Sequence, residues 1–182
     1  MLVGEGGAKG EEELLGPYGR VVPVAGKTTE LSNHVERLCG EHGIRIVERK
    51  ARGGWARKRD RTISVRPVKT ERTYIIALHE IGHLIGSHRG GRRLEQEAAA
   101  WDFVIERSIV PLSPASYAFM LRCLESYLHR ATFSRRAMVI PEKGHRFWAT
   151  YAEIGRRAAD GTGWTSGPAE GAVRRDPPGR PC

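Results

Sequence analysis

The residues best suited to chemistry in this sequence form one short pattern, His79-Glu80-Ile81-Gly82-His83. Histidines four positions apart lie one turn apart on the same face of a helix, so both imidazoles can reach a single Zn²⁺ at about 2.0–2.1 Å. The glutamate between them projects beside the metal, toward its open coordination position. The pattern therefore predicts a metal site in which Glu80 accepts a proton from an activated water.

A catalytic zinc ion normally has three protein ligands and a water, so a third ligand must be found. One alternative places it after the second histidine, at HExxHxxGxxH spacing, but Arg89 occupies that position and His88 falls one residue short. The other alternative is a glutamate of the next predicted helix, which contains Glu95 and Glu97. These two side chains point about 200° apart around a helix, so only one of them can face the metal.

The segment from Thr73 to Ser87, which carries the pattern, is apolar on more than one face and predicts a helix buried in the domain. Two histidines and a glutamate are costly to bury in such a helix unless they are hydrogen-bonded or ligated. The alternative interpretation, two partly exposed histidines without a metal, is therefore the weaker one.

Other elements must hold this helix in place. Two runs are rich in β-branched residues, 44–48 and 62–66, and they predict the two strands of a hairpin. The long basic loop between them contains Gly53 and Gly54. Pro67 either closes the second strand or marks it as an edge strand. Apolar spacing and helix-capping signals predict further helices over 30–42, 94–109, from Ser113-Pro114 to about 128, and 143–157. The expected fold class is α+β, with a small antiparallel hairpin packed on the histidine-bearing helix.

Length and composition limit the domain organisation. The chain has 182 residues, and its glycines and prolines concentrate at both ends. Residues 1–30 and 158–182 are therefore expected to be disordered tails around one domain over 31–157. No apolar run approaches the roughly 18 residues that span a membrane, and the N-terminus lacks a signal-peptide pattern, so the expected location is the cytoplasm. Three cysteines, Cys39, Cys123 and Cys182, match no zinc ribbon or disulfide framework.

The positive charge is concentrated in one segment. Between Arg45 and Arg72 there are eleven Lys and Arg residues against three acidic ones, a net +8 of the chain's total of +9. Such a segment can attract nucleic acid or an acidic partner. It can also be a solvated loop, because charge runs are common and only Trp55 is interleaved as a stacking group.

Taken together, Arg72, the segment Ala77 to His83 and the following Glu95-x-Glu97-Ala98-x-x-Trp101 resemble the ImmA/IrrE family of zinc metallo-endopeptidases. The resemblance covers about residues 31–111 and implies a minimal zincin-like fold. It implies Zn²⁺ held by His79, His83 and Glu95, with Glu97 the second choice and Glu80 the general base. Three features depart from the family pattern: Ala99 replaces the usual Asn, Trp101-Asp102 replace Phe-Ala, and the helix runs on toward Pro111.

The resemblance implies an endopeptidase that hydrolyses a protein substrate, with a repressor-type DNA-binding regulator as one candidate. A second interpretation is a SprT-like protease acting on DNA-bound proteins, with nucleic acid held by segment 45–72. A third is a non-catalytic basic module with a structural zinc, although a structural site needs no general base. Four residues remain open as stabilisers of the reaction's oxyanion: His88, Tyr117, His129 and His145.

Overall fold

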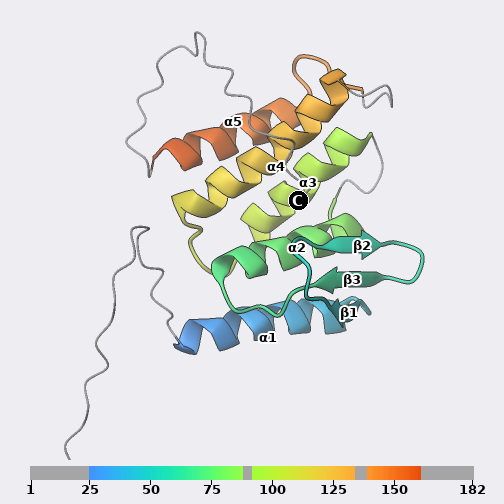
Figure 1. Cartoon of the computed structure of the whole chain (residues 1–182), viewed down its shortest axis with the longest axis vertical. Coiled ribbons are helices and arrows are strands. Elements are labelled where there is room, and N and C mark those ends of the chain that lie inside the picture. The colour runs from blue at the N-terminus through green and yellow to red at the C-terminus, as the bar shows by residue number, and fades with distance from the viewer. Residues whose placement is uncertain (1–24, 88–91, 134–138, 161–182) are drawn as a thin grey trace, which may run out of the picture.

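The computed structural model describes residues 25–87, 92–133 and 139–160. The elements are α1 (Ala25–Glu41), β1 (Arg45–Glu48), β2 (Trp55–Arg57), β3 (Thr62–Val65), α2 (Glu71–Ile85), α3 (Arg93–Arg107), α4 (Pro114–Phe133) and α5 (Arg146–Ala159). Helix α2 lies at the centre, with α1 and the sheet on one side and α3, α4 and α5 on the other (Figure 1). The α+β class predicted from the sequence is confirmed.

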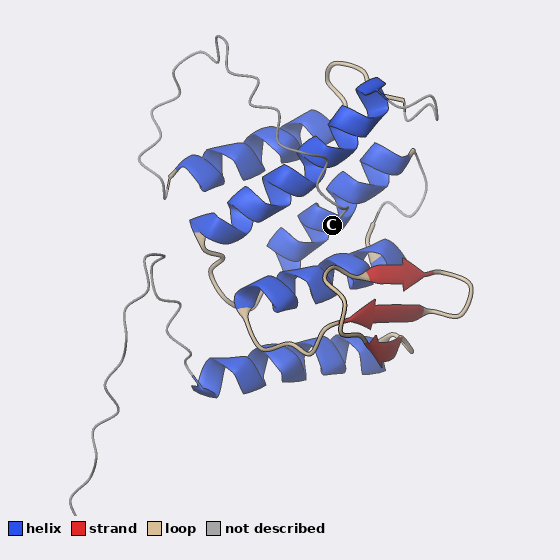
Figure 2. Cartoon of the chain, in the orientation of Figure 1, coloured by secondary structure: helices blue, strands red, loops and turns tan. Residues whose placement is uncertain are grey.

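The sheet differs from the predicted hairpin. β1 and β3 pair in parallel, and a third strand, β2, pairs with β3 in antiparallel orientation, giving the order β1-β3-β2 (Figure 2). The basic loop is long enough to carry the chain from the end of β1 across to the far side of β3, with a positive φ of 77° at Gly53. The hairpin is therefore β2–β3. Pro67 follows the end of β3, which is the central strand and not an edge.

Helix α2 begins two residues before the predicted start because Thr70 caps it. The Thr70 side chain accepts a hydrogen bond from the backbone N–H of Thr73, and the Thr73 hydroxyl accepts one from the backbone N–H of Thr70. Most of the helix is buried, as its apolar sequence predicts. Its Tyr74 hydroxyl lies 2.8 Å from Nδ1 of His34 and accepts a hydrogen bond from the backbone N–H of Ile109, which links α2 to α1 and to the end of α3.

Helices α2 and α3 pack closely at Gly82. A Cβ atom added there would lie 3.1 Å from the carbonyl oxygen of Ala100 and 3.1 Å from Cβ of Phe103. A side chain at this position would require α3 to move by a few tenths of an ångström. The small side chain of Ala100, which is 1% exposed, lies on α3 at this contact.

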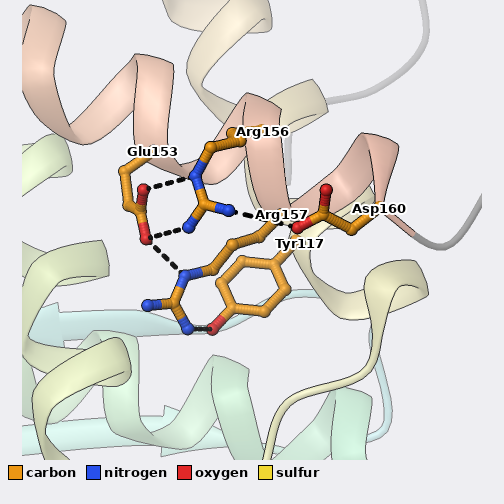
Figure 3. A network of polar contacts seen from close by, with 5 residues as sticks. All are labelled: Tyr117, Glu153, Arg156, Arg157 and Asp160. Atoms are coloured by element: carbon orange, nitrogen blue, oxygen red, sulfur yellow. Dashed lines mark hydrogen bonds and ion pairs between the residues drawn. The ribbon is translucent and has the colours of Figure 1, made fainter. Parts of the chain in front are cut away.

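Helices α4 and α5 cover the other side of α3. Ser113 accepts a hydrogen bond from the backbone N–H of Ser116, which confirms the predicted cap before Pro114. Arg157 of α5 donates to the hydroxyl of Tyr117 of α4 at 2.9 Å and also to Glu153, and Arg156 joins Glu153 to Asp160 (Figure 3). This network attaches the last turns of α5 to the start of α4.

Helix α1 begins at Ala25, inside the range 1–30 that was expected to be a tail, and α5 ends at Ala159, two residues beyond the predicted domain limit. Residues 1–24 and 161–182, including Cys182, lie outside the described residues. Cys39 and Cys123 are buried and form no disulfide, and burial raises the pKa of Cys39 to about 11. Among the described residues, no helix combines the length and apolarity needed to cross a membrane.

The contact at Gly82 can be tested by a packing comparison. Gly82→Val is expected to lower the free energy of unfolding by about 1–3 kcal/mol, because the added methyl groups meet the backbone of α3. Gly40→Val is the matched control: a Cβ at Gly40 of α1 meets no atom within 4 Å. The control should change stability by less than about 0.5 kcal/mol. Equal effects in denaturant unfolding would contradict the close packing at Gly82.

Candidate metal centre

Helix α2 presents both histidines of the pattern from one face. Nε2 of His79 and Nε2 of His83 lie 3.1 Å apart, with the His79 side chain nearly buried and that of His83 slightly more open. Glu80, on the same helix, is also buried. The helical spacing thus brings the three residues to one place, as the sequence predicts.

Helix α3 supplies a third ligand-type side chain, Glu97, which is 1% exposed. Its Oε2 atom lies 3.2 Å from Nε2 of His79 and 3.6 Å from Nε2 of His83. Ligand atoms at about 2.0–2.1 Å around a tetrahedral zinc ion lie about 3.3 Å from one another. The three measured separations of 3.1, 3.2 and 3.6 Å therefore match one face of a tetrahedron. Within the described part of the chain, this is the one group of three His, Cys, Asp or Glu side chains found close enough to share a metal ion.

The prediction that Glu95 faces the histidines is corrected by this geometry. Glu95 lies in the first turn of α3, where its Oε2 accepts a hydrogen bond from the backbone N–H of Arg92 at 2.9 Å. Its other oxygen lies 3.7 Å from Nε2 of His145. As expected from the 200° separation, only one of the two glutamates points to the histidines, and it is Glu97. His88 lies outside the described residues.

The sequence itself contains a signal that distinguishes Glu97 from Glu95 as the ligand. Leu94, Glu97, Trp101 and Val104 recur at spacings of three, four and three residues, the pattern of one helix face. All four side chains are buried against the rest of the domain. A glutamate on the buried face of an otherwise apolar stripe is the better candidate for a ligand, whereas Glu95 stands where a carboxylate caps the helix.

The protonation states of the group suit cation binding. Burial lowers the pKa of His79 to about 4, so this imidazole is neutral near pH 7. Burial alone would raise the pKa of Glu97, but hydrogen bonds with His79 and His83 outweigh it and hold that pKa well below its usual range. Oε1 of Glu97 also lies 2.8 Å from a guanidinium nitrogen of Arg93.

A divalent cation fits this donor set. Two imidazole nitrogens and one carboxylate oxygen converge on one point. A shared proton can bridge only two of these three atoms, whereas a cation can bind all three. Two histidines and one carboxylate are a known set for catalytic zinc. The His79 ring is oriented by Trp101, whose ring centroid lies 4.0 Å away at an interplanar angle of 34°. Nδ1 of His79 has no hydrogen-bond partner among the described residues, so this stacking takes the orienting role that a hydrogen bond often has.

The group opens into a cleft of about 450 Å³. One wall is the start of β2 and the residues before it, and the others come from α2, α3 and α4. Gly54 lies against Glu80, since a Cβ at Gly54 would be 2.7 Å from Cγ and 2.8 Å from Oε1 of that glutamate. Burial raises the pKa of Glu80 to about 7, with the charge of His83 opposing the shift.

Two cleft residues were missed by the sequence analysis. Tyr127 of α4 lines the cleft, and its hydroxyl accepts a hydrogen bond from Arg93 at 3.2 Å. Arg93 also pairs with Glu97, so it joins the tyrosine to the ligand group. No local pattern marks Tyr127, because its position depends on how α4 crosses α3.

The predicted oxyanion candidates lie elsewhere or are not described. Tyr117 is buried and its hydroxyl is engaged by Arg157 (Figure 3). His145 caps α5 by accepting a hydrogen bond from the backbone N–H of Phe147. His129 is on α4 but is not among the residues that line the cleft. Tyr127 lines the cleft, whereas none of these three residues does, so Tyr127 is the better candidate for the oxyanion stabiliser.

Comparison of the chain with models of protein families, with curated proteins and with solved structures gave no match. The resemblance to the ImmA/IrrE family therefore rests on the motif residues themselves.

The choice between the two glutamates has a direct test. Glu97→Gln is expected to weaken Zn²⁺ binding by at least about tenfold, the loss seen even for residues that only support a ligand. Glu95→Gln is the matched control and should bind Zn²⁺ like the unaltered protein. Affinity is measured by competition with a chelator, and circular dichroism confirms that both variants are folded. Loss of binding in Glu95→Gln alone would restore Glu95 as the ligand.

Proposed function

We propose that the protein is a zinc-dependent endopeptidase with a zincin-like active site, in which His79, His83 and Glu97 hold Zn²⁺ and Glu80 is the general base. The observation that carries the proposal is the buried Glu80 carboxyl beside a three-ligand group that faces an open cleft. A purely structural zinc normally has four protein ligands and no neighbouring base. Within the described residues this group has three ligands, as in catalytic sites.

Zinc bound here would supply Lewis acidity, polarising both a water molecule and the substrate carbonyl. Glu80 accepts the proton of the attacking water and later returns it to the leaving amine. Burial raises the pKa of Glu80 above the ordinary carboxyl value, which makes its carboxylate a stronger base toward the proton of the water. Gly54 limits the positions available to the Glu80 side chain and so keeps its carboxyl beside the ligand group.

The cleft offers a place for an extended polypeptide. β2 is an edge strand, and the chain from Gly53 to Ala56 lines the cleft. A peptide can pair with such an edge through main-chain hydrogen bonds, which bind it without requiring a particular sequence. The Tyr127 hydroxyl, held by Arg93, is the group we assign to the oxygen of the scissile carbonyl as charge develops on it.

The finer assignments rest on the motif resemblance. It favours a regulatory protein as substrate, with a repressor-type DNA-binding protein as the leading candidate. The second candidate, a DNA-bound protein as for SprT-like proteases, rests on the basic segment 45–72. The cytoplasm is the proposed location, because Cys39 and Cys123 are buried as thiols, as expected in a reducing compartment.

The role of Glu80 is tested by Glu80→Gln. The variant is expected to retain Zn²⁺, because Glu80 is not a ligand, and to lose activity by about 10²–10⁴-fold, the usual contribution of a general base. The zinc-loaded full chain is incubated with a proteome-derived peptide library, and new N-termini are quantified by mass spectrometry. Absence of cleavage by the unaltered protein would contradict the proposed function. Full activity of the variant would show that Glu80 is not the general base.

The contact between Gly54 and Glu80 gives a second test of the mechanism. Gly54→Ala is expected to displace the Glu80 carboxyl and to lower kcat by about 100-fold, the size of loss caused by misplacing a catalytic group by about 1 Å. Zn²⁺ affinity should change little, because the three atoms nearest to the added methyl group all belong to Glu80, which is not a ligand. Gly40→Ala, in open space on α1, is the control. Equal activity of the two variants on the same library would contradict the positioning role of Gly54.

A further inference from the structure

A second hollow, of about 770 Å³, adjoins the metal cleft. It is formed by the chain that follows β1, the loop from β3 to α2 and the first turns of α2. Gly53, Ile76 and Phe119 line both hollows. A polypeptide lying across the metal centre therefore has a direct continuation into this second hollow.

The second hollow is strongly basic. No carboxylate lines it, and six cationic side chains do. We term it the basic groove, defined by Arg49, Lys50, Arg52, Arg66, Lys69 and Arg72. Five of these side chains are exposed and Arg49 is half-buried. Helix α2 also begins at this groove, and the N-terminal end of a helix carries partial positive charge.

These cations differ from other basic residues of the same segment. Arg45 and Arg57 both pair with Asp60, and Arg61 donates to the backbone carbonyl of His42. Among the described residues, none of the six groove cations forms an ion pair with a carboxylate. The charge of Arg49 also acts on Glu80 in the adjoining cleft, but no carboxylate lies among the residues that line the groove itself. Like charges gathered in one hollow repel one another, and an anionic ligand would relieve that repulsion.

We propose that the basic groove binds an acidic segment of the polypeptide substrate, next to the bond that is cleaved, so that the protein selects sequences rich in Asp and Glu on one side of the scissile bond. This inference rests on the proposed endopeptidase function and adds the substrate class. Charge complementarity and the shared lining with the metal cleft carry it.

Nucleic acid is the less favoured occupant. Proteins that hold single strands combine positive charge with exposed aromatic rings on which bases stack. Phe119 is the one aromatic residue that lines the groove, and the guanidinium of Arg72 lies 4.1 Å from the centre of its ring. The ring is thus already engaged, whereas carboxylates need only the guanidinium and ammonium groups that remain free of acidic partners.

Binding is tested with the zinc-loaded full chain carrying Glu80→Gln, so that the probe is not cleaved. The probes are a fluorescein-labelled oligoglutamate peptide, an oligolysine peptide of the same length and a single-stranded oligonucleotide. Adding Arg66→Glu with Lys69→Glu should weaken oligoglutamate binding by at least about tenfold, because attraction becomes repulsion at two positions. Arg59→Glu with Lys143→Glu changes the net charge equally outside the groove and should have little effect. We call Arg66→Glu with Lys69→Glu the groove pair and Arg59→Glu with Lys143→Glu the control pair. Equal oligoglutamate binding with and without the groove pair overturns the proposal.

Cleavage separates this inference from the function on which it rests. The unaltered protein, incubated with the peptide library, should show Asp and Glu enriched on one side of the cleaved bonds, and the groove pair should abolish that enrichment while the control pair keeps it. Cleavage without a preference for acidic residues overturns the inference but leaves the proposed peptidase function standing. In that case, loss of oligonucleotide binding in the groove pair would assign the groove to nucleic acid. If nothing is cleaved, the proposed function fails, and oligoglutamate binding still decides what the groove holds.

Discussion

The close approach of α2 and α3 at Gly82 is the contact on which the rest of the structure depends. The missing side chain lets the backbone of α3 lie against α2, and this brings Glu97 within 3.2 Å of His79. The cost of burying a carboxylate at 1% exposure is offset by two histidines on one side and Arg93 on the other. A larger residue at this position would meet the backbone of α3 at Ala100 and would push Glu97 away from the histidines.

The departures from the motif pattern have roles in this packing. Trp101 stacks on the His79 ring and also contacts Phe119 of α4 edge to face, so it joins the ligand group to the helices behind it. Asp102 pairs with Arg146 at the start of α5. Ala99 is buried, so an amide side chain has no room in solvent at this position. The end of α3 at Arg107 also places Ile109 where its N–H reaches Tyr74, which ties the metal-bearing helix to the chain beyond α3.

The basic segment has three distinct parts in the folded chain. Some of its arginines pair with Asp60, Arg61 supports the turn at His42, and six cations line the groove beside the metal cleft. The same segment also contains β2 and places Gly54 against Glu80. One stretch of sequence therefore forms the edge strand β2, restricts the positions of the Glu80 side chain and gathers positive charge beside the metal cleft.

The sequence by itself determined the features that depend on local spacing: the presence of five helices, the cap at Ser113, and two histidines one turn apart on a buried helix. Only the tertiary structure decided which glutamate joins them, that β1 and β3 run parallel, and that Tyr127 and Gly54 enter the site. Spacing along a helix settles which residues share a face, because the helical repeat is fixed. The rotation of α3 against α2, the path of the chain from β1 to β3 and the crossing of α4 depend on contacts between residues far apart in sequence, and local patterns do not contain them.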